Sequence, residues 1–242
     1  MQQDRPIWGF DLGGTKIEGA ILESRQNPRV LYRMRVPTEA QKGYDHIIGQ
    51  VRTLVDMLSE ESGMRPESLG LGHPGTLDPI TGVIKNANTT ALNGRPFHED
   101  LKNTLGIPVK LANDANCFAV AETLMGAAPE VLPNAEVVFG VIMGTGVGGG
   151  VVVRGKVING RQGIGGEWGH NFLDEIGGPC YCGRTGCVET VISGPALERF
   201  YEKNSGKHLQ LKEIVALSLT GADPIATATM DHLIHYFGKA IA

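Results

Sequence analysis

Aromatic side chains are scarce in this sequence, at 6% of 242 residues, and no apolar run approaches the roughly 20 residues of a membrane-spanning helix. Segments rich in Lys or Arg are also lacking, and the formal net charge is −4. Nucleic acid and membranes are therefore not expected as partners. The N-terminal residues have neither the cationic region nor the long apolar stretch of a signal peptide, so we expect a cytoplasmic protein.

Cysteine is also scarce, with four residues, but three of them gather in one short segment with a histidine. His170, Cys180, Cys182 and Cys187 predict a tetrahedral zinc site, because cytoplasmic thiols stay reduced. Buried thiols or a disulfide are the alternatives, although the one-residue spacing of Cys180 and Cys182 suits a disulfide poorly. Four protein ligands leave no open position, so the zinc would be structural. Cys117 lies outside the cluster, and we interpret it as a core residue.

Two acidic residues flank the predicted metal ligands. Glu167 precedes His170 by three residues, and Glu189 follows Cys187 by two. A metal bound to these ligands would fix both carboxylates in space. Because carboxylates accept hydrogen bonds from several hydroxyls, the arrangement favours a polyol-binding pocket.

Hydrophobic patterning predicts an α/β protein. The expected strands are 7–12, 17–22, 30–36, 68–72, 109–111, 137–143 and 151–153. The expected helices are 44–58, 115–124 and most of the chain from 194 onward, with breaks at Gly206 and Gly221. A pattern of strand, Gly-rich turn and strand occurs near both 12 and 144, which suggests two similar halves around a cleft.

Glycine is abundant, with 34 residues, and two Gly-rich segments each follow an apolar strand. In the first, Gly13 and Gly14 lack Cβ atoms, so backbone N–H groups can approach a phosphate. Thr15 adds a hydroxyl donor, and Asp11 offers a carboxylate to Mg²⁺. The alternative is an ordinary hairpin turn, since neither a Walker nor a Rossmann motif is present. The segment 144–150 has the same character, and together the two favour a clamped nucleotide.

Asn113 and Asp114 stand where a strand ends and a helix begins. Helix capping is one interpretation, since both residue types are common at that position. The other makes Asp114 a general base, because phosphoryl transfer needs a base beside the attacking hydroxyl. Both hold if Asn113 caps the helix while Asp114 faces a cleft.

Taken together, these motifs resemble the ROK family (repressors, open reading frames, kinases), in family order and from about residue 7 to 195. The matching pieces are DLGGTK at Asp11, GHPG at Gly72, NDANC at Asn113, GTGVGGG at Gly144, GEWGH at Gly166 and CYCGRTGCVET at Cys180. The resemblance implies a two-lobed actin-like ATPase (ribonuclease H-like) fold, with sugar and ATP in the interlobe cleft. We expect a small α/β lobe at 1–113 and a larger one with the zinc-binding loop at 114–242.

The resemblance also implies a role for each matching residue. Asp114 would be the base that takes the proton from the sugar's primary hydroxyl. His170 would bind zinc through one ring nitrogen and sugar through the other. The residues implied to hold the sugar are Gly75, Asn88, Asn113, Asp114, Glu167, His170 and Glu189. Those implied to bind ATP with its Mg²⁺ are Asp11, Gly13, Gly14, Thr15, Lys16, Gly144, Thr145 and Gly146.

The implied activity is ATP-dependent phosphorylation of a hexose. The segments 79–88, 92–97 and 167–171 look like the bacterial fructokinase (mannokinase) branch, so fructose is the first expectation. The N-acetylglucosamine kinase branch is next. Kinases of this family often form dimers, and a homodimer is expected.

Two further interpretations belong to other classes. A sugar-sensing repressor would carry a DNA-binding unit ahead of Asp11, for which ten residues are too few. A non-catalytic sugar-binding remnant is the second. Family kinases continue past a helix like 224–242 into a strand, an adenosine-contacting loop and a final helix, so we expect that the C-terminal portion is missing here.

Overall fold

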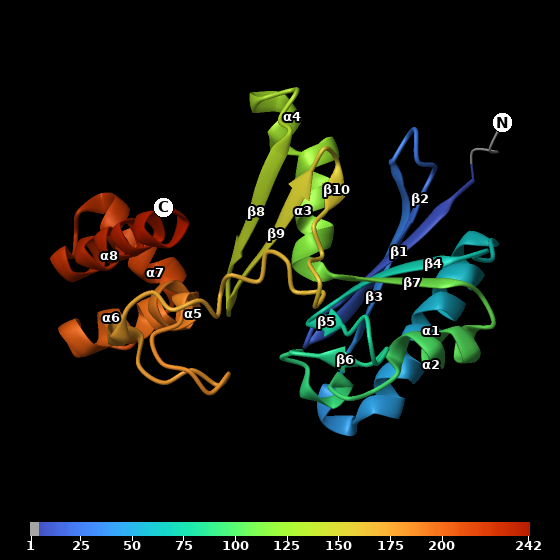
Figure 1. Cartoon of the computed structure of the whole chain (residues 1–242), viewed down its shortest axis with the longest axis horizontal. Helices are drawn as coiled ribbons and strands as arrows, with labels where there is room; N and C mark the ends of the chain where they lie inside the picture. Colours follow the sequence, from blue (N-terminus) through green and yellow to red (C-terminus); the bar gives the residue numbers. More distant parts are fainter. Residues whose placement is uncertain (1–4) are drawn as a thin grey trace. The chain divides into compact units, whose positions relative to one another are not determined.

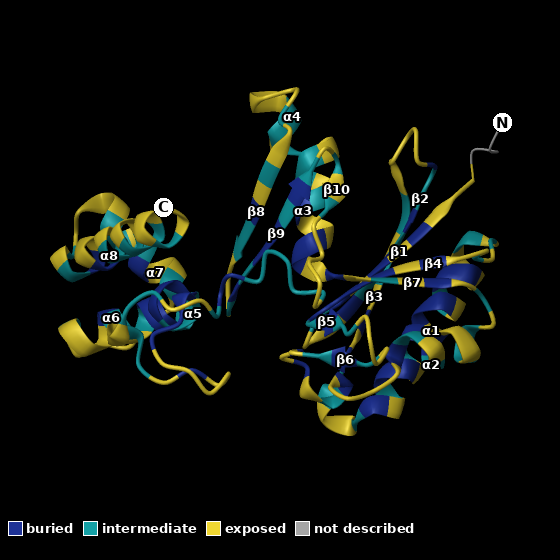
Figure 2. Ribbon diagram, viewed as in Figure 1, coloured by how far each residue is buried: buried dark blue, intermediate teal, exposed yellow. Residues whose placement is uncertain are grey.

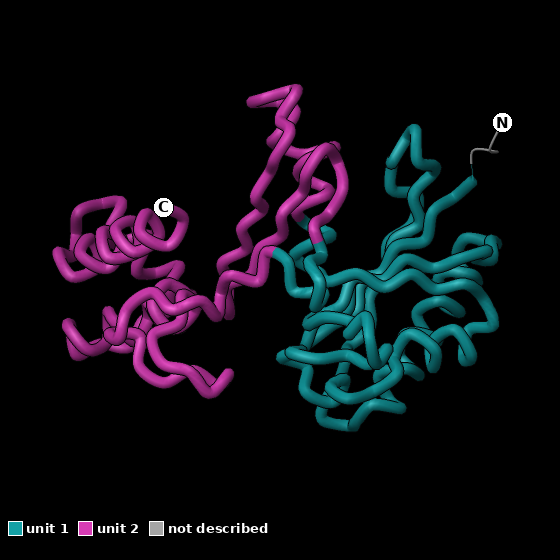
Figure 3. The backbone as a smooth tube through the Cα atoms, in the orientation of Figure 1, with its two compact units in different colours: residues 1–118, 159–165 teal, residues 119–158, 166–242 magenta. Residues whose placement is uncertain are grey.

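A computed structural model describes residues 5–242. They form two compact units, coloured separately in Figure 3. The first contains the residues up to 118 together with 159–165, and the second contains 119–158 and 166–242. The boundary lies within helix α3 (Asp114–Met125), five residues beyond the division between 113 and 114 suggested by the sequence.

The first unit is built on a five-stranded sheet with the order β3-β2-β1-β4-β7 (Figure 1). Its strands are β1 (Ile7–Leu12), β2 (Lys16–Leu22), β3 (Val30–Pro37), β4 (Leu69–His73) and β7 (Val109–Asn113). β1 pairs antiparallel with β2 and parallel with β4, and β4 pairs parallel with β7. All five strands confirm runs predicted from the sequence.

The core of this unit lies between the sheet and two helices. Alternation along β1 buries Trp8, Phe10 and Leu12 on one face. Helix α1 (Tyr44–Ser62) packs against β2 and β3, and α2 (Phe97–Leu105) packs against β7. The apolar face of α1 is buried, as Figure 2 shows, and its completely buried residues are Ile47, Val51, Leu54 and Leu58.

Polar residues gather at the carboxyl ends of the parallel strands. Asp11 near the end of β1 is in register with Gly72 of β4, and His73 is in register with Asn113 of β7. Helix α3 starts directly after β7, at Asp114. Because parallel strands end at the same edge, residues far apart in the sequence become neighbours there.

The second unit combines a small antiparallel sheet, ordered β10-β9-β8, with helices (Figure 1). Its strands are β8 (Val137–Met143), β9 (Val147–Val153) and β10 (Lys156–Val157). Its remaining helices are α4 (Ala127–Val131), α5 (Val188–Ile192), α6 (Gly194–Ser205), α7 (Leu211–Thr220) and α8 (Pro224–Ile241). One core cluster contains Val147 and Trp168, and another contains Tyr201.

The C-terminal helices end and begin where the sequence provides caps. Gly206 and Gly221 adopt the left-handed conformation after α6 and α7, which confirms the predicted breaks. Ser193 caps α6, and Asp223 caps α8 by accepting backbone N–H groups. Among residues 5–242, no helix combines the length and hydrophobicity that crossing a membrane requires.

Short elements were not predicted from the sequence. They are α2, α4, α5, β10, the strands β5 (Thr76–Leu77) and β6 (Ile84–Lys85), and the 3-10 turns Ala40–Lys42, Thr90–Leu92 and Glu175–Gly177. Each is too short to show a clear period, and α2 buries only Phe97 and Leu101.

We expect Leu54→Ala to lower the free energy of unfolding of the first unit by about 2–5 kcal/mol, because it opens a cavity beneath α1. Urea denaturation followed by circular dichroism measures this loss. Arg52→Ala, on the exposed face of the same helix, should change the value by less than about 0.5 kcal/mol. Equal stability of the two variants would contradict the packing described.

Candidate functional site

The first Gly-rich segment is a tight hairpin turn between β1 and β2. Gly13 N donates to Lys16 O at 2.9 Å, so the hairpin interpretation is right for the backbone. The turn is held from outside by the buried residue Thr38, whose hydroxyl donates to Gly13 O at 2.7 Å. Thr38 N also donates to Thr15 O at 3.0 Å. The sequence did not point to Thr38, because these contacts join distant parts of the chain.

Gly14 and Thr15 are exposed at this turn, as a phosphate-binding role requires. Lys16, the third exposed residue there, is bound to Glu18 of the same strand, with 3.1 Å between Nζ and Oε2. The ammonium group therefore neutralises a neighbouring carboxylate in the structure. Its predicted role toward ATP remains a prediction.

Two carboxylates stand at the strand ends of the first unit. Burial raises the pKa of Asp114, while the hydrogen bond from Ala115 N, 2.8 Å long, lowers it. Burial also raises the pKa of Asp11, the negative charges of Asp114 and Glu18 raise it further, and Lys16 opposes them. The carboxylates of Asp11 and Asp114 are thus close enough to repel each other, and such a pair attracts a cation.

The predicted sugar residues of the first unit lie together. Gly75 has φ of 75°, and a Cβ there would lie 2.5 Å from Lys85 O and 2.6 Å from Ala87 N. Only glycine allows this approach, which brings the exposed Asn88 into the neighbourhood. Asn113 Nδ2 donates to Gly75 O at 3.0 Å. This hydrogen bond joins two of the residues that the resemblance assigned to the sugar, and the third, Asn88, directly follows Ala87, which packs against Gly75.

Asn113 also caps α3, since its Oδ1 accepts from Asn116 N at 3.0 Å. This confirms the capping interpretation for Asn113, while the role of Asp114 as a general base stays a prediction. The prediction that Cys117 is a core residue is wrong, because its side chain is exposed. Desolvation by the surrounding protein is the main cause of a raised pKa of the Cys117 thiol, and the negative charges of Asp114 and Asp11 raise it further.

The second Gly-rich segment forms an equivalent turn between β8 and β9, but only residues 144–146 belong to it. The prediction of a turn up to 150 is wrong, because Val147 to Gly150 pair with β8 as part of β9. Gly144 N donates to Gly146 O at 2.9 Å, and Met143 pairs with Val147. Gly144 and Thr145 are exposed. Both predicted phosphate turns thus sit at the ends of antiparallel hairpins.

The predicted sugar residues of the second unit lie on two segments that contact each other. Glu189 N donates to Gly169 O at 2.9 Å, which joins the start of α5 to the segment carrying Glu167 and His170. Trp168 anchors that segment, because its buried indole donates to Gly148 O at 2.9 Å. Glu167, His170 and Glu189 are all partly buried.

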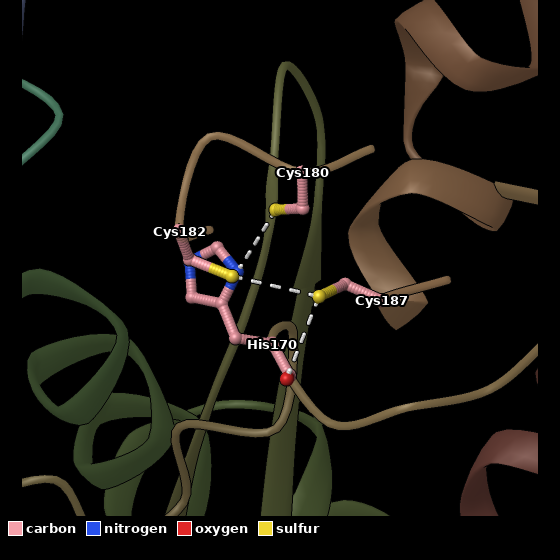
Figure 4. Close-up of side chains that lie close together, drawn as sticks. All are labelled: His170, Cys180, Cys182 and Cys187. Carbon is pink, nitrogen blue, oxygen red and sulfur yellow. Dashed lines mark hydrogen bonds between the residues drawn. The ribbon is translucent and has the colours of Figure 1, made fainter. Parts of the chain in front are cut away.

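His170, Cys180, Cys182 and Cys187 converge, as the sequence predicted (Figure 4). Their candidate ligand atoms all lie within 4.8 Å of one another. His170 Nδ1 is 3.5 Å from the sulfur of Cys180, and the sulfurs of Cys182 and Cys187 are 3.6 Å apart. Sulfur ligands at about 2.3 Å from a tetrahedral ion would be about 3.8 Å apart, so the residues fit such an ion.

The orientation of His170 assigns a different contact to each ring nitrogen. Nδ1 faces the thiol cluster, and Nε2 lies 3.1 Å from the hydroxyl of Tyr181. The rings of His170 and Tyr181 meet edge to face, with centroids 5.1 Å apart. The nitrogen predicted to face the sugar therefore contacts an exposed tyrosine that the sequence did not single out.

We expect the purified chain to contain one zinc ion, and we expect Cys182→Ser to lower zinc affinity at least about tenfold by removing a thiolate ligand. Elemental analysis and a competition titration with a chromophoric chelator measure both quantities. Cys117→Ser is the matched control, because Cys117 lies outside the cluster. Equal zinc affinity in both variants would exclude Cys182 as a ligand.

A second prediction follows from the raised pKa of Asp114. A folded pKa above the ordinary value of 3.8 means that Asp114 favours folding below pH 3.8 and that this contribution is lost as pH rises through the folded pKa. Asp114→Asn should therefore raise the thermal midpoint at pH 7 and leave it unchanged near pH 3. Differential scanning calorimetry tests this, with exposed Asp231→Asn as control. An equal rise in the thermal midpoint at both pH values would contradict the raised pKa of Asp114.

Comparisons with known proteins agree with this arrangement. An N-acetyl-D-glucosamine kinase of Pectobacterium atrosepticum is 37% identical over 218 residues, which cover 86% of this chain and 69% of that protein. The ROK hexokinase of Thermus thermophilus superposes with a TM-score of 0.80 and 34% identity, over 98% of this chain and 76% of that one. A ROK family glucokinase from Streptomyces griseus, in complex with glucose and AMPPNP, superposes with a TM-score of 0.79 and 27% identity. The match covers 98% of this chain and 78% of that one.

These structures confirm the predicted α/β fold, which is the actin-like ATPase fold of the ROK kinases. The sequence match to the family extends over residues 7–242 and so includes both Gly-rich turns, the strand ends and the metal-binding segment. The chain belongs to the ROK family.

Proposed function

We propose that this sugar kinase phosphorylates N-acetylglucosamine, with ATP as the phosphoryl donor and the primary hydroxyl as acceptor. The curated relatives support this substrate, since those of Pectobacterium, Yersinia and Salmonella are all N-acetyl-D-glucosamine kinases at 35–37% identity. None of them supports the fructose preference expected from the sequence. The observation that carries the proposed chemistry is the carboxylate of Asp114 at the carboxyl end of β7, beside Asp11.

Asp114 is proposed as the general base. Its raised pKa gives the carboxylate a higher proton affinity than an aspartate with an ordinary pKa has. It accepts the proton of the sugar's primary hydroxyl as that oxygen attacks the γ-phosphorus, and the bond from the γ-phosphorus to the β-phosphate oxygen breaks to release ADP. The hydrogen bond from Ala115 N to Oδ1 restricts rotation of the carboxylate and is proposed to help position it for the sugar hydroxyl. Such positioning is the main demand of phosphoryl transfer.

The two Gly-rich turns are proposed to bind the phosphates through backbone N–H groups and the hydroxyls of Thr15 and Thr145. Asp11 is proposed to hold Mg²⁺, which neutralises phosphate charge when bound. The mutual repulsion of Asp11 and Asp114 fits this role, because a cation relieves it. Thr38 keeps the first turn in shape.

The sugar hydroxyls are proposed to bind Asn88 and Asn113 of the first unit, and Glu167, His170 and Glu189 of the second. Zinc is proposed as a structural ion that fixes His170 and Cys187 and thereby the nearby carboxylates. It supplies no chemistry to the transfer, because four protein ligands complete its shell. A homodimer and a cytoplasmic location remain predictions.

A coupled ATP-consumption assay with N-acetylglucosamine, fructose, glucose and mannose tests the proposal. We expect the highest kcat/KM for N-acetylglucosamine, and we expect Asp114→Asn to lower kcat by about 100-fold or more with little change in sugar affinity. Exposed Asp231→Asn is the control for the loss of one carboxylate.

Three outcomes of these assays would contradict the proposal. A higher kcat/KM for fructose would reject the substrate, and turnover retained by Asp114→Asn would reject the base. Sugar binding without phosphorylation of any of the four sugars would reject the kinase activity and favour a binding protein.

A further inference from the structure

The second Gly-rich turn is held at both ends by groups from the segment that carries a predicted sugar ligand. Gly194 N donates to Gly144 O at 2.8 Å, at the start of the turn. At its end, Val147 N donates to Glu189 Oε2 at 3.0 Å. The turn itself contains one internal hydrogen bond, from Gly144 N to Gly146 O. Its conformation therefore depends on these outside partners.

Glu189 is well placed to hold the turn because its own backbone is fixed. It lies in the first turn of α5, and its N–H donates to Gly169 O. Its carboxylate is partly buried, and a hydrogen bond to a charged acceptor is among the stronger ones in proteins.

The residue at position 146 leaves room for this contact. A Cβ built on Gly146 would collide with Oε2 of Glu189. The colliding atom is the end of a flexible side chain, so Gly146→Ala would displace the carboxylate more readily than the backbone. Glycine at this position is thus required for the bond between Glu189 and Val147, although its φ is not in the left-handed region.

We propose that Glu189 is a positioning residue for the nucleotide turn as well as a sugar ligand, so that one carboxylate couples the two substrates. The inference rests on the proposed function, and it adds a role toward ATP to a residue assigned only to the sugar. Oε2 holds Val147 N–H, and a carboxylate has further lone pairs for a sugar hydroxyl. A bound hydroxyl restricts rotation of the carboxylate and so favours the orientation that holds the turn.

The proposed coupling between sugar binding and nucleotide binding must be positive. Sugar should tighten nucleotide binding, and nucleotide should tighten sugar binding by the same factor, because linkage is reciprocal. A residue that only binds sugar would change the KM for sugar and leave the KM for ATP unaltered.

Two substitutions at Glu189 separate these possibilities. Glu189→Gln keeps the length and an acceptor oxygen, so it should retain the bond to Val147 N while weakening sugar binding. Glu189→Asp is one methylene shorter and should lose that bond. We therefore expect amide hydrogen exchange at Val147 in the ligand-free chain, read by NMR, to be faster by about tenfold in Glu189→Asp and close to wild type in Glu189→Gln.

Steady-state kinetics provide the functional readout. At saturating sugar, the KM for ATP should rise about tenfold in Glu189→Asp, and it should stay within about twofold of wild type in Glu189→Gln. Gly146→Ala should reproduce the faster exchange at Val147 with Glu189 intact.

The matched control is Glu198→Asp. Glu198 Oε1 accepts from Leu211 N at 2.8 Å, a bond of the same kind between α6 and the start of α7. Its loss should speed exchange at Leu211 and leave the KM for ATP unchanged. A rise in the KM for ATP in this variant as large as in Glu189→Asp would overturn the proposal, because any such loss would then have the same effect.

Failure of the inference and failure of the proposed function give different results. An unchanged KM for ATP in Glu189→Asp, with a raised KM for sugar, overturns the coupling and leaves the kinase intact. If the wild-type chain phosphorylates no hexose, the proposed function fails, and exchange at Val147 decides the positioning role alone. Equal exchange in wild type and Glu189→Asp overturns that role, and faster exchange in the variant supports it.

Discussion

The backbone of the two Gly-rich turns has to be held by groups from elsewhere in the chain, because glycine restricts its own conformation so little. Thr38 holds the first turn through its N–H and its hydroxyl. Glu189 and Gly194 hold the second, one at each end. The partners come from the end of a strand in one unit and from helix starts in the other. Exposed N–H groups that bind phosphate are useful only while such contacts keep them in place, so the proposed nucleotide chemistry depends on these few hydrogen bonds.

Charge is concentrated where the parallel strands of the first unit end. Asp11 and Asp114 raise the local proton affinity through burial and, for Asp11, through mutual repulsion. A raised carboxylate pKa costs stability in the free protein when the group is ionised, and such shifts are common at functional sites. In the phosphoryl transfer proposed above, one carboxylate would remove a proton and the other would attract a cation. The first unit tolerates this loss of stability because its sheet and α1 bury a continuous apolar face.

The thiol cluster organises the second unit in a comparable way. Cys187 directly precedes α5, so a bound ion would fix the start of the helix that carries Glu189. His170 belongs to the same cluster, and Trp168 beside it is anchored to β9. The thiol cluster, the proposed sugar ligands and the second Gly-rich turn therefore share one set of short backbone connections. This proximity would allow the carboxylate of Glu189, which accepts from Val147 N, to contact a sugar hydroxyl as well.

Local patterns in the sequence predicted the long strands, α1, the helix breaks and the metal ligands, because each depends on periodicity, caps or residues close together in the chain. Helix α2 escaped detection because it buries only Phe97 and Leu101. The motif order identified the family, but the short segments from 79 to 97 suggested fructose, and sugar preference depends on pocket shape rather than on such matches. Only the tertiary structure decided that Cys117 is exposed, that Thr38 holds Gly13 and that Glu189 holds Val147. These contacts join residues far apart in the chain, and their geometry is set by how strands and helices pack, which no local pattern encodes.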